Sequence, residues 1–464
     1  MPAAFRKNSR LRLCERPLPP LPTMPPATPT SASSWHIQLL SGLAQDLAQA
    51  KARLGSSSES APHIHDMGRC DLQTIIDVCT ALQGGAEPEE SFPTLLQVIN
   101  ASHARMWDAP SSSALTVWRS IYTDACIVRA LAHSMVSDHL QAISALDHAI
   151  IIAGPCGEGR LDLVLDMIGR IQAFVPADVA TAPHPLATMQ AHIDSPLCTI
   201  PSPQPPSLLA FKKTHSHSPF ILRNYASEWP AVNNWKSASY LRSISGPGRV
   251  VPVEIGRDYR LGDWKQELMS WDILLSALDF EDQPSSASST DLYYLAQHDL
   301  TKQFPSLRDD IILPDYLYAS ITPTDYPEYR PPNNDDQVIL NTWLGPKNTM
   351  SPAHIDPYYN FYVQVVGQKT VWLAPPTVSA YIRPPLPSNS PAESDSSHFP
   401  SSALSNTSEI DVFAPEQAHP DFIKNVQPVS MTAVLNPGDM LFFPPGWWHA
   451  MRSESTSFSL SMWF

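Results

Sequence analysis

Three side chains in this sequence could hold a metal ion together. His354 and Asp356 lie two positions apart, and His449 lies far downstream. Residues i and i+2 of a strand point to the same face, so a strand would present His354 and Asp356 side by side. Two imidazoles and one carboxylate bind non-haem Fe(II) on one face and leave the other positions open for oxygen and a co-substrate. If the three side chains converge, the sequence predicts an oxygenase.

The third candidate ligand must come from a second strand. A turn-forming Asn-Pro-Gly-Asp segment at 436–439 leads into the apolar run 440–443, which is typical of a strand. A histidine just beyond that strand, His449, can meet His354 and Asp356 across the mouth of a barrel. An isolated His-x-Asp pattern is common by chance and is usually a surface pair, so the flanking sequence has to decide between the two interpretations.

The elements that would position these residues lie in the second half of the chain. Residues 1–33 are rich in Pro, Ser and Thr and are predicted to form a disordered tail. Leucines at helical spacing follow, and we expect a helical domain over residues 34–200. Short β-branched and aromatic runs over residues 201–464 indicate an antiparallel sandwich or barrel, and therefore an α+β chain. The Ser- and Pro-rich stretch 384–418 is predicted to be a disordered surface insertion.

Composition excludes several classes of function. The 464 residues carry a net charge of −15, which argues against direct nucleic-acid binding and suits a basic protein or peptide partner. The six cysteines form no close pair of the zinc-binding type, and none follows Cys198, which fits structural thiols in a reducing compartment. No apolar run of about 18 residues is present, so we expect no membrane span. We expect an intracellular protein, nuclear or cytoplasmic, with a basic mitochondrial presequence as the alternative.

Several ordered blocks resemble the JmjC family of Fe(II)- and 2-oxoglutarate-dependent oxygenases. The resemblance covers roughly residues 211–464 and implies a double-stranded β-helix, that is, a jelly-roll, cupin-like barrel. It also implies that His354, Asp356 and His449 bind Fe(II), with 2-oxoglutarate and O2 as co-substrates. The blocks that carry it are WLGP at 343–346, SPAHIDPYYN at 351–360, FYVQVVGQK at 361–369, PGD at 437–439 and PPGWWH at 444–449, with VPVEIG at 251–256 and YLAQH at 294–298 similar to one subgroup.

A keto-acid co-substrate needs a fixed cation for its far carboxylate, and Lys369 is the candidate. If Gly367-Gln368 is a two-residue hairpin loop, Lys369 shares one face with Asn360, Tyr362 and Gln364. Burying a charged lysine without a partner costs free energy, so the alternative for Lys369 is a solvated position in a turn. The resemblance favours the carboxylate-binding role of Lys369 and implies that Tyr294, Ser351 and Asn360 are hydrogen-bonding partners of the co-substrate. Alternatively, Tyr294 is a core aromatic, Ser351 a turn residue and Asn360 a strand cap.

Two substrate classes compete. The resemblance favours hydroxylation of an arginine side chain in a protein, and the alternative is demethylation of N-methyl-lysine with release of formaldehyde. The carboxylate ligand is Asp356, whereas lysine demethylases of the family often use Glu. A guanidinium could pair with Glu254 and stack on Trp343 and Trp463, although glutamates more often face solvent and tryptophans more often lie in a core.

A third interpretation belongs to another class of protein. Members of this fold can lose activity and act as binding scaffolds, and the helical domain could bind a protein partner by itself. The complete ligand set and Lys369 argue against an inactive protein.

Overall fold

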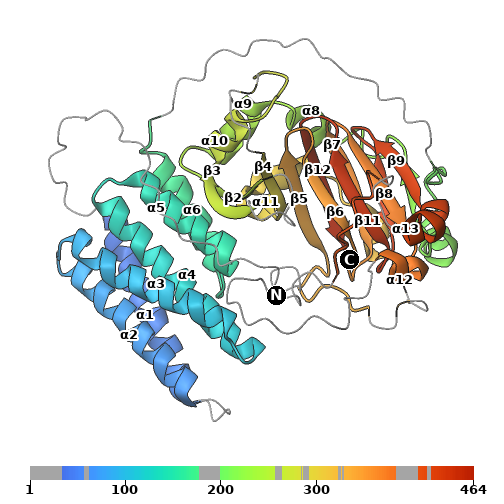
Figure 1. The fold of residues 1–464 in the computed structure, drawn as a ribbon. Helices are drawn as coiled ribbons and strands as arrows, with labels where there is room; N and C mark the ends of the chain where they lie inside the picture. Colours follow the sequence, from blue (N-terminus) through green and yellow to red (C-terminus); the bar gives the residue numbers. More distant parts are fainter. Residues whose placement is uncertain are drawn as a thin grey trace.

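The computed structural model shows a helical part packed beside a part built on two antiparallel sheets (Figure 1). The predicted tail of residues 1–33 lies outside the described residues. The described residues are 34–56, 62–176, 199–256, 264–283, 285, 292–321, 326, 329–382, 406–414 and 420–464.

Among the described residues, six α-helices make up the N-terminal part. Leu40, Leu43 and Leu47 recur on one face of the first helix and are buried, which is why this segment is helical and packs. Ser111 caps the N-terminus of the fourth helix, and its hydroxyl accepts a hydrogen bond from the amide of Ala114. The helices are α1 (Ser34–Ser56), α2 (Pro62–Gln83), α3 (Phe92–Trp107), α4 (Ser112–Met135), α5 (His139–His148) and α6 (Arg160–Gln172).

The C-terminal part contains an eight-stranded and a four-stranded sheet, and neighbouring strands in both are antiparallel. The larger sheet has the order β1 (Phe220–Leu222), β10 (Met440–Phe443), β7 (Asn360–Val366), β12 (Ser457–Trp463), β5 (Ile339–Gly345), β4 (Tyr293–His298), β2 (Val250–Ile255) and β3 (Lys265–Ser270). The smaller sheet has the order β6 (Met350–His354), β11 (Trp448–Ser453), β8 (Lys369–Ala374) and β9 (Met431–Leu435).

The two sheets face each other across one apolar cluster. Tyr362 and Leu441 of the larger sheet pack in this cluster with Leu373, Leu435 and Met451 of the smaller sheet. Alternation along each strand separates these inward residues from those on the outer faces. A side chain that lies on an inner face therefore points into the space between the sheets, where a binding site can form.

A buried carboxylate of the helical part bonds to the larger sheet and to the segments beside it. Asp147 of α5 accepts hydrogen bonds from Nη2 of Arg249 at 2.7 Å and from Nε2 of Gln303 at 2.8 Å. The backbone amide of Val250, at the start of β2, donates to the same carboxylate at 2.9 Å. Asp147 and Arg249 are both buried, so their charges are compensated entirely within the protein.

The prediction that residues 384–418 form a disordered insertion is wrong for residues 406–414. In this segment Thr407 forms a β-bridge with His354, and Ser408 and Val412 are buried. Hydrogen bonds to β6 hold the segment, and a composition rich in Ser and Asn could not reveal these distant partners. Residues 383–405 and 415–419 lie outside the described part of the chain.

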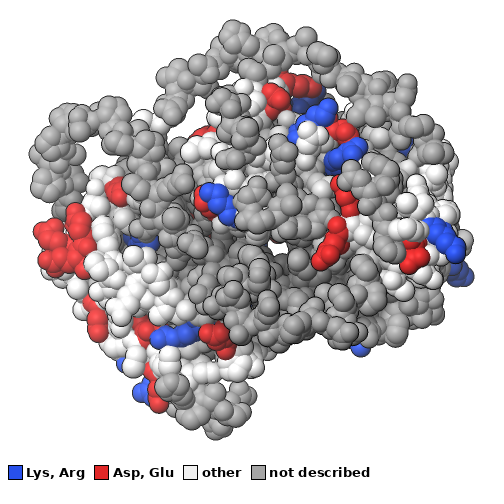
Figure 2. Space-filling model, in the orientation of Figure 1, with Lys and Arg blue, Asp and Glu red and all other residues white. Residues whose placement is uncertain are grey.

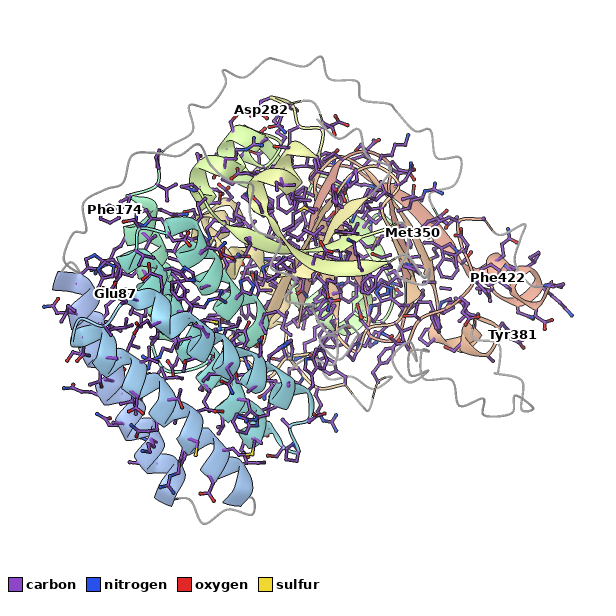
Figure 3. All side chains as sticks on the ribbon, turned by 60° about the vertical axis from the view of Figure 1, so that its left-hand side comes forward. Glu87, Phe174, Asp282, Met350, Tyr381 and Phe422 are labelled. Atoms are coloured by element: carbon purple, nitrogen blue, oxygen red, sulfur yellow. The ribbon has the colours of Figure 1, made fainter. Side chains whose placement is uncertain are left out.

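Two short helices lie next to this segment. The helices α12 (Ser379–Ile382) and α13 (Pro420–Asn425) cover the outer face of the smaller sheet, where Tyr381 and Phe422 mark them in Figure 3. No helix among the described residues is both long enough and apolar enough to cross a membrane.

Candidate active site

The structure brings the side chains of His354, Asp356 and His449 together. His354 ends β6 and lies directly opposite His449 on β11. Oδ2 of Asp356 lies 3.4 Å from Nε2 of His449 and 3.8 Å from Nε2 of His354. Neighbouring ligands of an octahedral metal lie roughly 3 Å apart when each metal–ligand bond is about 2.1 Å. The spacing therefore fits one divalent ion after small side-chain adjustments.

The hydrogen bonds of both imidazoles indicate which ring nitrogen carries the proton. Nδ1 of His354 lies 2.8 Å from the carbonyl oxygen of Pro352, and Nδ1 of His449 lies 3.0 Å from that of Trp447. A carbonyl only accepts, so Nδ1 carries the proton in each ring and Nε2 presents its lone pair. Fixing the ring and its tautomer in this way is typical of metal-binding histidines.

A β-bulge in β6 turns two predicted site residues inward. His354 pairs with His449 and Ser351 pairs with Met451, so two residues of β6 lie opposite Ala450 alone. In a regular strand, residues three positions apart point to opposite faces. The bulge instead places Ser351 on the inner face with His354, and Ser351 hydrogen-bonds with Tyr294.

Lys369 is buried between the sheets, which excludes a solvated turn position. Its Nζ donates to Oη of Tyr362 at 3.0 Å and to Oη of Tyr294 at 3.2 Å. Burial lowers the pKa of Lys369 to about 7. Burial also raises the pKa of both phenols, so they stay neutral. Among the described residues no carboxylate pairs with Lys369, and an anionic ligand would supply the missing charge.

The hairpin that the sequence argument for Lys369 took as its condition does not form. β7 pairs with β10 and β12, whereas β8 pairs with β11 and β9. The turn at Gly367 therefore carries the chain from one sheet to the other. Gly367 has a φ of +71°, and a Cβ there would lie 1.9 Å from the carbonyl oxygen of Thr456, so only glycine fits. Lys369 still faces inward because it begins β8 on the inner face.

Four buried polar atoms on neighbouring strands have no hydrogen-bond partner in the described structure. A buried polar atom without a partner costs roughly 1–3 kcal/mol, so such a group is expected where a ligand supplies the partners. Ser461 lies opposite Asn341, and Trp463 lies opposite Asn360, so the four residues adjoin. The atoms are Nδ2 of Asn341, Oδ1 of Asn360, Oγ of Ser461 and Nε1 of Trp463.

Two of these four residues, Asn341 and Ser461, were missed by the sequence interpretation. Their signal is the alternation of β12, in which Ser457, Ser459 and Ser461 occupy every second position between large apolar residues. Small polar residues on the inner face of a buried strand leave room for a ligand. The inner row of β12 is therefore part of the candidate pocket.

The three residues predicted to hold the substrate lie around the same space. Glu254 lies opposite Tyr294 in the pairing of β2 with β4. Burial is the largest cause that raises the pKa of Tyr294, and the neighbouring Tyr362 and the charge of Glu254 raise it further. The ring of Trp343 lies 5.8 Å from that of Tyr362. The ring of Trp463 stacks on Tyr358 at 5.3 Å.

Comparison with known proteins identifies the class. The model of the cupin-like domain family matches residues 207–464. Lysine-specific demethylase JMJ30 of Arabidopsis thaliana is 30% identical over 389 residues, which cover 78% of this chain and 83% of that protein. Jumonji C domain-containing protein 5 of Drosophila melanogaster is 32% identical over 402 residues, which cover 85% and 92%. Lysine-specific demethylase 8 of Xenopus tropicalis is 34% identical over 268 residues, which cover 57% and 52%.

The C-terminal part is thus a cupin-like domain, preceded by N-terminal helices, and the predicted fold class is confirmed. The chain belongs to the cupin-like JmjC family, and the predicted resemblance to that family is confirmed. The subgroup that residues 251–256 and 294–298 resemble is that of JmjC domain-containing protein 5, the name that the Drosophila relative carries. As a member of this family, it is an enzyme of the 2-oxoglutarate-dependent oxygenase class.

Proposed function

We propose that this protein is an Fe(II)- and 2-oxoglutarate-dependent oxygenase that hydroxylates an arginine side chain of a protein. The observation that supports the chemistry most strongly is the placement of two ligands and a buried cation on one sheet face. His449 lies opposite Leu373, and Lys369 lies opposite Ser453, in the same pairing of β11 with β8. Four residues of strand separate the two positions by about 13 Å, which side chains and a five-carbon diacid can span.

In this proposal each predicted residue has one task. Bound Fe(II) would supply the oxidising chemistry: O2 oxidises 2-oxoglutarate to succinate and carbon dioxide, and its second oxygen atom enters the substrate C–H bond. His354, Asp356 and His449 would hold the ion on one face. The protonated Lys369 would bind the far carboxylate of the co-substrate, and three neighbours would orient it through hydrogen bonds: Tyr294, Ser351 and Asn360.

Arginine is the substrate side chain that suits the remaining residues. A guanidinium carries five donors and no acceptor, so the Glu254 carboxylate can pair with it. The planar cation would stack on the ring of Trp343 and on the face of the Trp463 ring that is turned away from Tyr358. The acidic composition, 45 Asp and Glu against 30 Lys and Arg, suits a basic peptide. Acidic side chains also lie over the helical part on the face drawn in Figure 2.

Demethylation of N-methyl-lysine is the second candidate because relatives are named lysine-specific demethylases. Hydroxylation of a methyl group would use the same iron and co-substrate residues and would release formaldehyde. We further propose an intracellular protein, nuclear or cytoplasmic, whose helical part can bind a protein partner.

Mass spectrometry of peptide substrates separates the two candidates. We expect the wild-type protein, supplied with Fe(II) and 2-oxoglutarate, to add one oxygen atom to an arginine-bearing peptide. The His354→Ala variant is the control and should leave the peptide unchanged. Loss of a methyl group from methyl-lysine with release of formaldehyde, and no oxygen gain on arginine, would favour demethylation instead.

A further inference from the structure

One residue of the 406–414 segment bonds to the peptide that joins two candidate metal ligands. The backbone amide of Ile355 donates to the carbonyl oxygen of Asn406 at 3.0 Å. In return, Nδ2 of Asn406 donates to the carbonyl oxygen of Ile355 at 2.9 Å. Ile355 stands between His354 and Asp356, so both of its backbone polar groups are held by a single distant residue.

These bonds act on the torsions that set the ligand geometry. Peptide planes are rigid, so the positions of the His354 and Asp356 side chains relative to each other depend on a few φ and ψ angles around Ile355. β6 is the edge strand of the smaller sheet, and β11 pairs with only one of its sides. Asn406 bonds the outer side, where no other strand of this sheet could restrain the peptide.

The segment that carries Asn406 is itself anchored. The amide of Ser408 donates to the carbonyl oxygen of Ala353 at 2.7 Å, and its hydroxyl donates to that of Ile382 in α12 at 2.7 Å. Oδ1 of Asn406 accepts from the hydroxyl of Thr407 at 3.4 Å, which turns Nδ2 toward Ile355. Asn406 is therefore held in place before any metal binds.

A second bond restrains the same loop from the other side. The amide of Gly446 donates to the carbonyl oxygen of Asp356 at 2.9 Å, which joins this loop to the turn before His449. With Asn406 on Ile355 and Gly446 on Asp356, the segment after β6 is restrained at two successive peptides. We propose that Asn406 is a positioning residue, which preorganises His354 and Asp356 for metal binding by holding the peptide of Ile355.

Binding of Co(II), a spectroscopic substitute for Fe(II), tests this inference through the variant Asn406→Ala. Loss of the Nδ2 donor should raise the Co(II) dissociation constant about tenfold or more, as expected for residues that orient metal ligands. The visible absorption of bound Co(II) should also change because it reports the ligand geometry. The metal-free variant should unfold within about 4 °C of the wild type, since alanine removes only the Nδ2 bond to Ile355 and the 3.4 Å bond from Thr407.

The matched control is Asn425→Ala in α13, which lies in the same connection between β8 and β9. Nδ2 of Asn425 donates to the carbonyl oxygen of Asp421 at 2.9 Å, away from the ligands, so its loss should leave Co(II) binding unchanged. An Asn406→Ala protein with wild-type Co(II) affinity and spectrum would overturn the inference. The inference would also be overturned if Asn406→Ala were unfolded both with and without metal, because weaker Co(II) binding would then reflect loss of the fold.

The inference rests on the proposed metal site, and the two can fail separately. A wild-type protein that binds no Co(II) would contradict the proposed function. A wild-type protein that binds Co(II), together with an unaltered Asn406→Ala variant, would contradict only the role of Asn406.

Discussion

At the scale of single residues, the buried charge of Lys369 is the feature that most needs a ligand. Among the described residues, only two neutral phenols, those of Tyr294 and Tyr362, bond to its ammonium group. A buried ammonium without a counter-ion is costly, and burial accordingly lowers the pKa of Lys369 to about 7. A dicarboxylate would supply the counter-charge, which is why we propose that Lys369 binds the co-substrate.

The variant Lys369→Met tests this assignment. Methionine keeps much of the length and removes the charge, so the dissociation constant for 2-oxoglutarate should rise by about 10- to 100-fold, the value of a charged hydrogen bond. Isothermal titration of the metal-loaded protein measures this change. Lys347→Met, at an exposed position, is the control and should bind normally. Unaltered affinity in Lys369→Met would place the carboxylate elsewhere.

The lowered pKa of Lys369 predicts a proton uptake on binding. Without ligand the pKa is about 7, so above pH 7 the amine is mostly neutral. The carboxylate of the co-substrate raises the pKa again, and each molecule bound at pH 8 should therefore take up close to one proton. At pH 6 the lysine is already charged, and uptake should vanish. Affinity should accordingly fall as the pH rises above 7.

Titration calorimetry in buffers of different ionisation enthalpy measures this uptake directly. The titratable groups around Lys369 are Tyr294 and Tyr362, which stay neutral over this range, with Glu254 beyond Tyr294. Binding with the same proton count at pH 6 and pH 8 would contradict a titrating Lys369.

At the scale of elements, close packing between strands fixes the pocket. Gly345 ends β5 against Tyr294 of β4, and a Cβ at Gly345 would lie 2.6 Å from Cδ2 of Tyr294. The tyrosine ring therefore occupies space that only a glycine leaves open. The ring position in turn sets the hydrogen bond from Lys369.

The variant Gly345→Ala should move Tyr294 and weaken co-substrate binding. We expect the dissociation constant of 2-oxoglutarate to rise severalfold while Co(II) affinity stays unchanged, since the metal ligands lie on other strands. Gly169→Ala on α6 is the control because nothing lies within 4 Å of its added Cβ, and it should stabilise the helix by up to about 1 kcal/mol. Equal affinity for 2-oxoglutarate in both variants would mean that Tyr294 does not orient the co-substrate.

At the scale of the whole molecule, the helical part and the sheets share one buried ion pair. Arg249 makes two bonds to Oδ1 of Asp147, at 3.1 Å from Nε and at 2.7 Å from Nη2. The residues lie 102 positions apart in the chain. Loss of Asp147 would leave the guanidinium of Arg249 buried without a counter-ion, so we expect the helical part to stabilise the sheets.

The variant Asp147→Ala should lower the free energy of unfolding by about 3–5 kcal/mol, the usual cost of breaking a buried ion pair. The double variant Asp147→Leu with Arg249→Met removes both charges and should recover most of this loss. Urea denaturation followed by circular dichroism measures both. A loss below about 1 kcal/mol in Asp147→Ala would show that water or another group compensates Arg249.

The sequence was informative where the determining interactions are local. The period of two in a strand is enough to place His354 beside Asp356, and leucine spacing is enough to predict α1. The bulge of β6, the passage between sheets at Gly367 and the bonds of Asn406 depend on partners distant in the chain. Composition suggested disorder near Asn406 because it cannot register hydrogen bonds to a strand far away in sequence.

Conversion of 2-oxoglutarate to succinate tests the proposed oxygenase activity most directly. We predict that the purified wild-type protein, given Fe(II), O2 and an arginine-bearing peptide, forms succinate in step with hydroxylated peptide. The Asp356→Ala variant, which keeps both histidines and Lys369, should form none above background. The proposed activity would be contradicted if the wild-type protein made no succinate with any arginine or methyl-lysine peptide, or if Asp356→Ala made it at the wild-type rate.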